Sequence, residues 1–123
     1  MADSIKHILS KEVGLKVNGS LWIEKEGKRF FGPGPVELLE LIADTGSISQ
    51  AAKKMKLSYK KAWEMVNKLN AQTIAPVVIV QIGGEKGGGS ILTEEARQLI
   101  KYYRLLRERF ATFLKVETMR LKR

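Results

Sequence analysis

The chain has 123 residues, a single histidine, no cysteine and a formal net charge of +9. This length suits one domain, residues 1–123, with a modest hydrophobic core, and the absence of cysteine excludes disulfide bonds. No apolar run approaches the ~20 residues of a membrane helix and no signal-peptide pattern opens the chain, so we expect a cytoplasmic protein that does not contact membranes. The sequence offers no nucleophile, acid pair or metal cluster, and we therefore expect neither an enzyme nor a bound cofactor or metal.

The positive charge is concentrated in two parts of the chain. Residues 47–72 contain six lysines and one acidic residue, Glu64, whereas residues 93–123 contain nine basic and four acidic residues. The first 46 residues are close to neutral, with six basic and seven acidic side chains. A basic excess confined to particular segments is typical of a protein that binds a polyanion, although basic surfaces also serve solubility alone.

A small β-ribbon is predicted ahead of the first long helix. Apolar residues alternate with polar ones from Leu15 to Phe31, and Asn18-Gly19 is a strong turn signal. The Gly-Pro-Gly-Pro run at 32–35 ends the ribbon and starts a helix that continues to near Gly46. Together with the next segment, this helix forms a predicted helical core over residues 33–72.

Residues 47–72 predict two short helices separated by a tight break. Ser47 is placed to cap the first helix, with Gln50 at the capping-box spacing, and Ser58 is placed to cap the second. This pattern fits a helix-turn-helix, but it also fits an ordinary helical hairpin with a solvated lysine face. The apolar stripe of the second helix consists of Ala62, Met65, Val66 and Leu69.

Residues 77–92 predict a β-hairpin that contains a glycine-rich loop. Pro76 ends the helical region, and a β-branched run follows it up to Ile82. The loop joins two strands and lacks a GxxxxGK[ST] pattern, so it is not a nucleotide-binding loop. We interpret the hairpin as a wing next to the helix pair, with Lys86 at its tip.

The last segment, residues 93–119, predicts one long helix capped by Thr93. Its apolar residues recur at alternating steps of three and four, which is the spacing of a coiled-coil seam. A stripe this long favours a dimerisation helix, although the helix could also fold back over its own domain. The residues expected at the dimer interface are Leu99, Tyr103, Leu106, Phe110 and Phe113.

The run GSISQAAKKMKLSYKKAWEMVNKLN, followed by GGEKGGGSILTEEARQLI, closely resembles the N-terminal DNA-binding domain of the molybdate-responsive ModE regulators. The likeness covers about residues 34–106. It implies an α+β, mainly α fold: a winged helix-turn-helix, related to the LysR-type reading head, with a small N-terminal β-ribbon and a long C-terminal dimerisation helix. Typical members continue into molybdate-binding domains beyond the region matched here, so we expect no molybdate binding by this chain.

The resemblance implies a homodimeric transcriptional regulator that docks its second helix in the major groove of double-stranded DNA. Lysines at the start of that helix would contact phosphates, and Glu64 could accept from a cytosine amino group. Trp63 could lie in the core or beside a base step. Two alternatives stay open, namely non-specific nucleoid-type nucleic-acid binding and a protein-interaction adaptor. The predicted DNA-binding residues are Ser47, Ser49, Gln50, Ser58, Tyr59, Lys60, Lys61, Trp63, Glu64 and Lys86.

Overall fold

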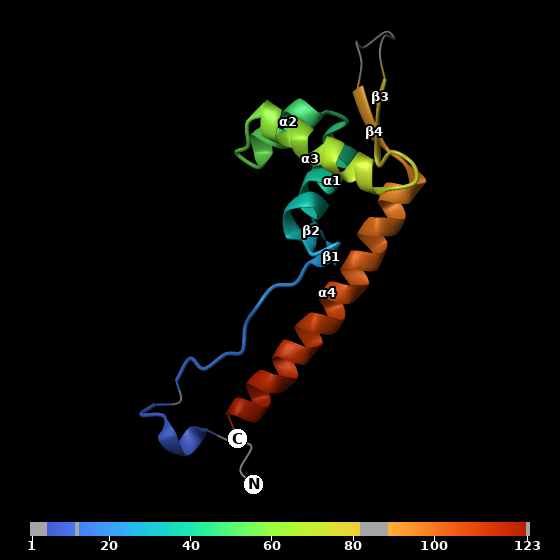
Figure 1. Cartoon of the computed structure of the whole chain (residues 1–123). Helices are drawn as coiled ribbons and strands as arrows, with labels where there is room; N and C mark the ends of the chain where they lie inside the picture. The colour runs from blue at the N-terminus through green and yellow to red at the C-terminus, as the bar shows by residue number, and fades with distance from the viewer. Residues whose placement is uncertain (1–4, 12, 82–88, 123) are drawn as a thin grey trace. The chain divides into compact units, whose positions relative to one another are not determined.

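The computed structural model of the protein describes residues 5–11, 13–81 and 89–122 (Figure 1). The chain divides into two compact units. One unit is Trp22–Tyr103, and the other combines Met1–Leu21 with Arg104–Arg123. The predicted α+β, mainly α class is confirmed, because the helices are accompanied by short antiparallel strands and the last helix is long.

The first unit begins with the predicted ribbon, in which β1 (Ile23–Lys25) pairs antiparallel with β2 (Lys28–Phe31). The two residues between the strands, Glu26 and Gly27, both have positive φ angles, of 54° and 76°. Two consecutive left-handed residues make the tight turn whose twist matches that of a hairpin. The ribbon is therefore shorter than the sequence pattern indicated, and it turns at Glu26-Gly27, not at Asn18-Gly19.

Three helices follow the ribbon: α1 (Pro33–Thr45), α2 (Ile48–Lys54) and α3 (Tyr59–Gln72). Helix α1 starts at a proline and ends at Gly46, whose φ of 68° is left-handed. The predicted caps are confirmed, because the hydroxyl oxygen of Ser47 accepts from the Gln50 N–H and that of Ser58 accepts from the Lys61 N–H. Each cap satisfies one of the free N–H groups at the start of its helix.

The hairpin after α3 consists of β3 (Val78–Gln81) and β4 (Gly89–Leu92). The strands pair antiparallel, with Val78 opposite Leu92 and Gln81 opposite Gly89. The expectation of two strands on either side of the glycine loop is therefore confirmed. The loop residues 82–88, including Lys86, lie outside the described residues.

The core of this unit is built from one apolar face of each helix together with the strands. Phe31 at the end of β2 packs edge-on against the ring of Tyr103, with 5.7 Å between the ring centroids. Both side chains are almost completely buried. Small residues lie where α2 and α3 meet the rest of the core and allow close packing. These small residues are Ala51, Ala52 and Ala62.

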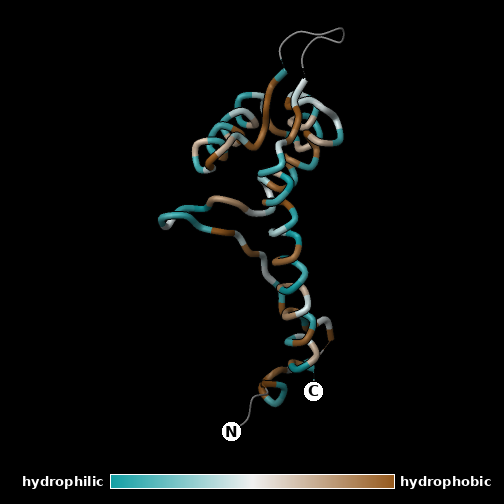
Figure 2. Tube along the Cα trace, turned by 90° about the vertical axis from the view of Figure 1, so that its right-hand side faces the viewer, coloured by the Kyte–Doolittle hydropathy of each residue, from teal (hydrophilic) through white to brown (hydrophobic). Residues whose placement is uncertain are grey.

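Helix α4 (Glu94–Leu121) starts with Thr93, whose hydroxyl oxygen accepts from the Ala96 N–H at 3.3 Å. Figure 2 shows hydrophobic and hydrophilic residues alternating along it. In the described part of the chain, no helix is both long and apolar enough to cross a membrane.

The second unit contains the short 3₁₀ helix η1 (Lys6–Ile8), an extended segment and the last part of α4. The extended segment is held by the helix, since the Val17 N–H donates to the hydroxyl of Thr118 at 2.9 Å. Residues 15–21 form no strand, although their alternating pattern had indicated one. None of the described residues of this unit is buried.

Candidate nucleic-acid interface

The two capped helices α2 and α3 follow each other through a short turn, and α3 turns one face inward. Ala62, Val66 and Leu69 on that face are buried. Since an α-helix has 3.6 residues per turn, Glu64, Asn67 and Lys68 lie on the opposite, exposed face, whereas Trp63 and Met65 flank the buried positions and are half-buried. The side chains exposed along the first half of α3 are Tyr59, Lys60, Lys61 and Glu64.

The capping serines keep one hydrogen-bonding group free for a ligand. In each cap the hydroxyl oxygen of Ser47 or Ser58 accepts a backbone N–H, so the hydroxyl proton is not used by the cap. Ser58 is exposed, as are Ser49 and Gln50 at the start of α2. A phosphate oxygen could therefore accept from these side chains.

Trp63 is half-buried, so it is neither a full core residue nor a free surface side chain. Its ring packs edge-on against Tyr59, with 6.2 Å between the centroids. Tyr59 itself remains 56% exposed. The pair presents an aromatic surface at the first turns of α3.

A hollow of about 190 Å³ brings several of the predicted residues together. Its lining comes from the start of α2, the start of α3 and the loop-side ends of strands β3 and β4. The hairpin thus lies beside the same helix ends that carry the predicted contacts. The members of the predicted set in this lining are Ser47, Ser49, Tyr59 and Trp63.

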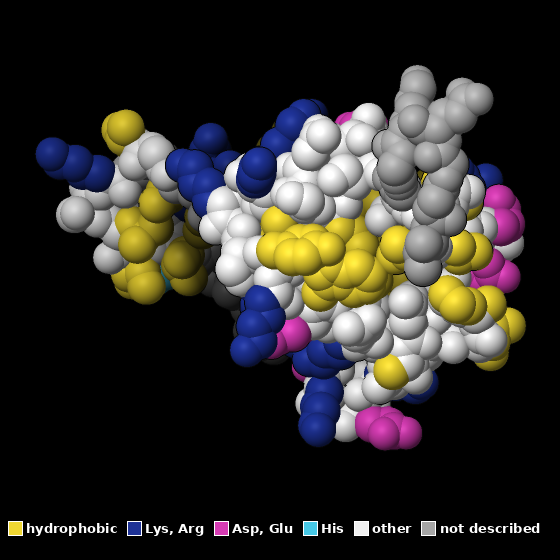
Figure 3. Space-filling view, turned by 90° about the horizontal axis from the view of Figure 1, so that it is seen from above, with side chains coloured by type: hydrophobic (Ala, Val, Ile, Leu, Met, Phe, Trp, Pro, Cys, Tyr) yellow, Lys and Arg dark blue, Asp and Glu magenta, His cyan; other side chains and the backbone are white. Residues whose placement is uncertain are grey.

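Three exposed lysines of α2 and the turn after it lie outside the predicted set. Lys53 and Lys54 in the last turn of α2, and Lys56 in the turn, are all exposed. The available signal for Lys53 and Lys54 was their position opposite the buried alanines of α2. Viewed from above, the surface shows a cluster of hydrophobic side chains with Lys and Arg side chains on the surface around it (Figure 3).

The predicted dimer-interface residues differ in how far they are buried. Tyr103 is 1% exposed and packs against Phe31, so its side chain belongs to the core of its own unit. Leu99, Leu106 and Phe110 are half-buried, and Phe113 is 54% exposed. The apolar stripe of α4 is therefore buried in the core at Tyr103 and exposed to solvent at Phe113.

Within the described ranges, no three or more His, Cys, Asp or Glu side chains gather in a way that would hold a metal ion.

Comparison with known proteins gives a consistent set of relatives. The chain is 46% identical over 81 residues to the molybdenum-pterin-binding protein MopB of Rhodobacter capsulatus, covering 66% of this chain and 30% of MopB. It is 41% identical over 86 residues to the DNA-binding transcriptional dual regulator ModE of Escherichia coli, covering 70% of this chain and 33% of that protein. The molybdenum transport protein ModE of Azotobacter vinelandii is 42% identical over 71 residues, which are 58% of this chain and 26% of that protein.

No protein-family model matches the chain. The chain spans about a third of the length of the relatives it matches. The matches confirm the resemblance that the sequence motifs indicated, and they are consistent with the N-terminal DNA-binding domain of ModE.

Proposed function

Because this chain is a relative of the ModE regulators over about 70% of its length, we propose that it is a transcriptional regulator that binds double-stranded DNA sequence-specifically as a homodimer. The observation that carries the proposal is the helix α3, capped by Ser58, which exposes Lys60 and Lys61 in its first turn. A capped helix with basic residues at its start is suited to the major groove of DNA.

Each exposed group has a role that follows from its chemistry. The lysines of α2 and α3 neutralise phosphates and position the protein on the duplex. Glu64 accepts a hydrogen bond from a base amino group, which supplies part of the sequence selection. Tyr59 and Trp63 offer apolar contact to the base edges or sugars beside the lysines. The hairpin, acting as a wing, contacts the neighbouring sugar-phosphate backbone of the DNA.

The dimer is supported by the unit that joins the chain's N-terminal segment to the last part of α4. In water an isolated helix is marginal, and most helical stability comes from packing of an apolar face. None of the described residues of this unit is buried, and large apolar side chains remain exposed on it. A second copy would cover them. These side chains are Ile8, Val13, Phe113, Val116 and Met119.

Selection of bound duplexes from a random pool tests the proposal. A dimer that reads sequence should enrich a palindromic consensus whose half-sites lie about one helical turn apart. Binding that falls steeply with salt but enriches no sequence would indicate non-specific nucleic-acid binding. No duplex binding even at low salt would contradict the proposal and favour an adaptor role.

A further inference from the structure

A groove of about 450 Å³ lies between the β1–β2 ribbon and α3, on residues that all belong to the unit Trp22–Tyr103. Its walls are largely apolar, with Phe30 and Pro33 on one side and Met65 on the other. This volume falls in the range of small-molecule sites in proteins, about 300–1,000 Å³. The hollow at the start of α3 has less than half this volume.

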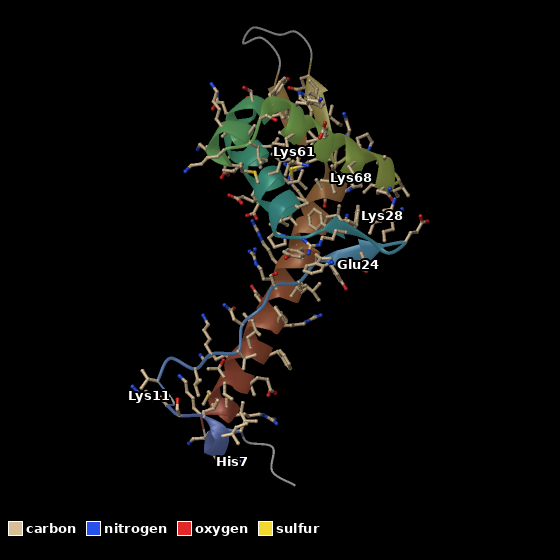
Figure 4. The ribbon with its side chains drawn as sticks, turned by 60° about the vertical axis from the view of Figure 1, so that its left-hand side comes forward. His7, Lys11, Glu24, Lys28, Lys61 and Lys68 are labelled. Carbon is tan, nitrogen blue, oxygen red and sulfur yellow. The ribbon has the colours of Figure 1, made fainter. Side chains whose placement is uncertain are left out.

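The rim of the groove is basic. Lys61 and Lys68 line it from α3, and Arg29 lines it from β2. Figure 4 shows Lys61 and Lys68 on α3, and Glu24 and Lys28 on the ribbon. Neither Lys61 nor Lys68 forms an ion pair with any residue that the structure describes. Glu64 is the acidic side chain in this lining, so three cations face one carboxylate.

A planar cation lies over an aromatic ring at the edge of the same groove. The guanidinium carbon of Arg29 lies 3.7 Å from the centroid of the Trp22 ring. The indole N–H of Trp22 donates to the Glu24 carboxylate at 3.1 Å, and this bond fixes the ring on the ribbon. The groove therefore has a positioned aromatic and cationic edge as well as apolar walls.

From this combination we infer that the groove binds a small organic anion with a flat apolar body, of the class of aromatic carboxylates. The apolar body would lie against Phe30 and Met65, and the carboxylate would accept hydrogen bonds from the rim cations. Lys61 and Lys68 are seven residues apart, about 10 Å along the helix. That length fits a small molecule better than a bound peptide helix.

The groove shares residues with the proposed DNA surface. Lys61 and Glu64 line it and also lie in the first half of α3. An occupant would therefore change DNA binding, and this consequence rests on the proposed function. The binding of the anion itself does not, because it can be measured without DNA.

The two tryptophans of the chain allow a direct test. Trp22 lines the groove, whereas Trp63 lines the separate hollow at the start of α3. The full chain, labelled with ¹⁵N, is titrated with sodium naphthalene-2-carboxylate while both indole N–H signals are followed by NMR, with assignment by Trp63→Phe. We expect a saturable shift of the Trp22 signal and a much smaller shift of the Trp63 signal.

Two comparisons separate the anion site from general hydrophobic binding. The neutral analogue naphthalene-2-methanol should bind about tenfold more weakly, because it cannot make a charge-assisted hydrogen bond. Lys68→Ala should weaken binding of the carboxylate several-fold, whereas Lys11→Ala, which removes an exposed lysine in the other unit, should leave that binding unchanged. Equal shifts of both indoles, a shift that does not saturate, or equal losses in the two lysine variants would overturn the inference.

Discussion

The backbone N–H of Ser90 donates a hydrogen bond to the carbonyl oxygen of Gly46, with 2.9 Å between the two atoms. Ser90 lies in β4 and is 6% exposed, while Gly46 ends α1 and immediately precedes the serine that caps α2. One bond therefore attaches the hairpin to the junction that sets where α2 begins. Gly46 therefore positions both the hairpin and the start of α2, which are two parts of the proposed DNA surface.

Replacing Gly46 with alanine should destabilise the fold. Gly46 has a φ of 68°, and in this left-handed conformation a Cβ costs roughly 1–2 kcal/mol. We expect Gly46→Ala to lower the free energy of unfolding in urea by about that amount. Asp44→Ala, at an exposed position in the last turn of α1, is the control. The control should be neutral or slightly stabilising, because an acidic side chain near the C-terminus of a helix is unfavourable, and equal losses in both variants would contradict this assignment.

Removing the cap of α3 should also reduce stability. The Ser58 hydroxyl oxygen accepts from the Lys61 N–H at 3.0 Å, and loss of such a cap typically costs about 1 kcal/mol. Ser58→Ala should therefore lower the midpoint of thermal unfolding. Ser20→Ala, at an exposed position outside any helix or strand, serves as the control and should leave the midpoint unchanged. An unchanged midpoint in both variants would show that the cap contributes little.

Lysines at the start of α3 should determine the salt dependence of DNA binding. The double variant Lys60→Ala/Lys61→Ala should bind the selected duplex more weakly, and its slope of log K against log salt should decrease by roughly one per lost phosphate contact. Lys11→Ala removes a charge from an exposed position in the other unit (Figure 4) and should change neither quantity much. If Lys11→Ala has an effect per charge as large as the double variant, bulk charge alone drives binding.

An acidic residue on the exposed stripe of α4 should dissociate the proposed dimer. Phe113 is 54% exposed in the single chain, so Phe113→Glu should leave the chain folded. In a dimer interface the same carboxylate would be buried without a partner, at a cost of several kcal/mol. Sedimentation equilibrium should then report a monomer. Thr112→Glu places the same charge at the preceding, exposed position and should remain dimeric. A dimer in both variants would show that Phe113 is not in the interface.

Local signals in the sequence were sufficient for most elements of the fold. Ser47 and Ser58 were identifiable as caps because a cap depends on residue type and on the N–H three residues further along the same chain. The β3–β4 strands were identifiable from a β-branched run and a glycine loop of suitable length. The ribbon was predicted in kind but not in extent: its turn lies at Glu26-Gly27, where both φ angles are positive, and residues 15–21 form no strand.

Only the tertiary structure decided which side chains meet across elements. Tyr103 matches the spacing of a coiled-coil seam, yet Phe31 from the ribbon packs against it. Spacing along one helix carries no information about which residue of another element will pack against that helix. The same holds for Arg29 and Lys68, which no sequence pattern connects and which the fold places on one groove. Periodicity therefore determined that α4 has an apolar face and that α3 has a basic one. Packing between residues far apart in the chain determined which parts of those faces stay exposed for a ligand or a second chain.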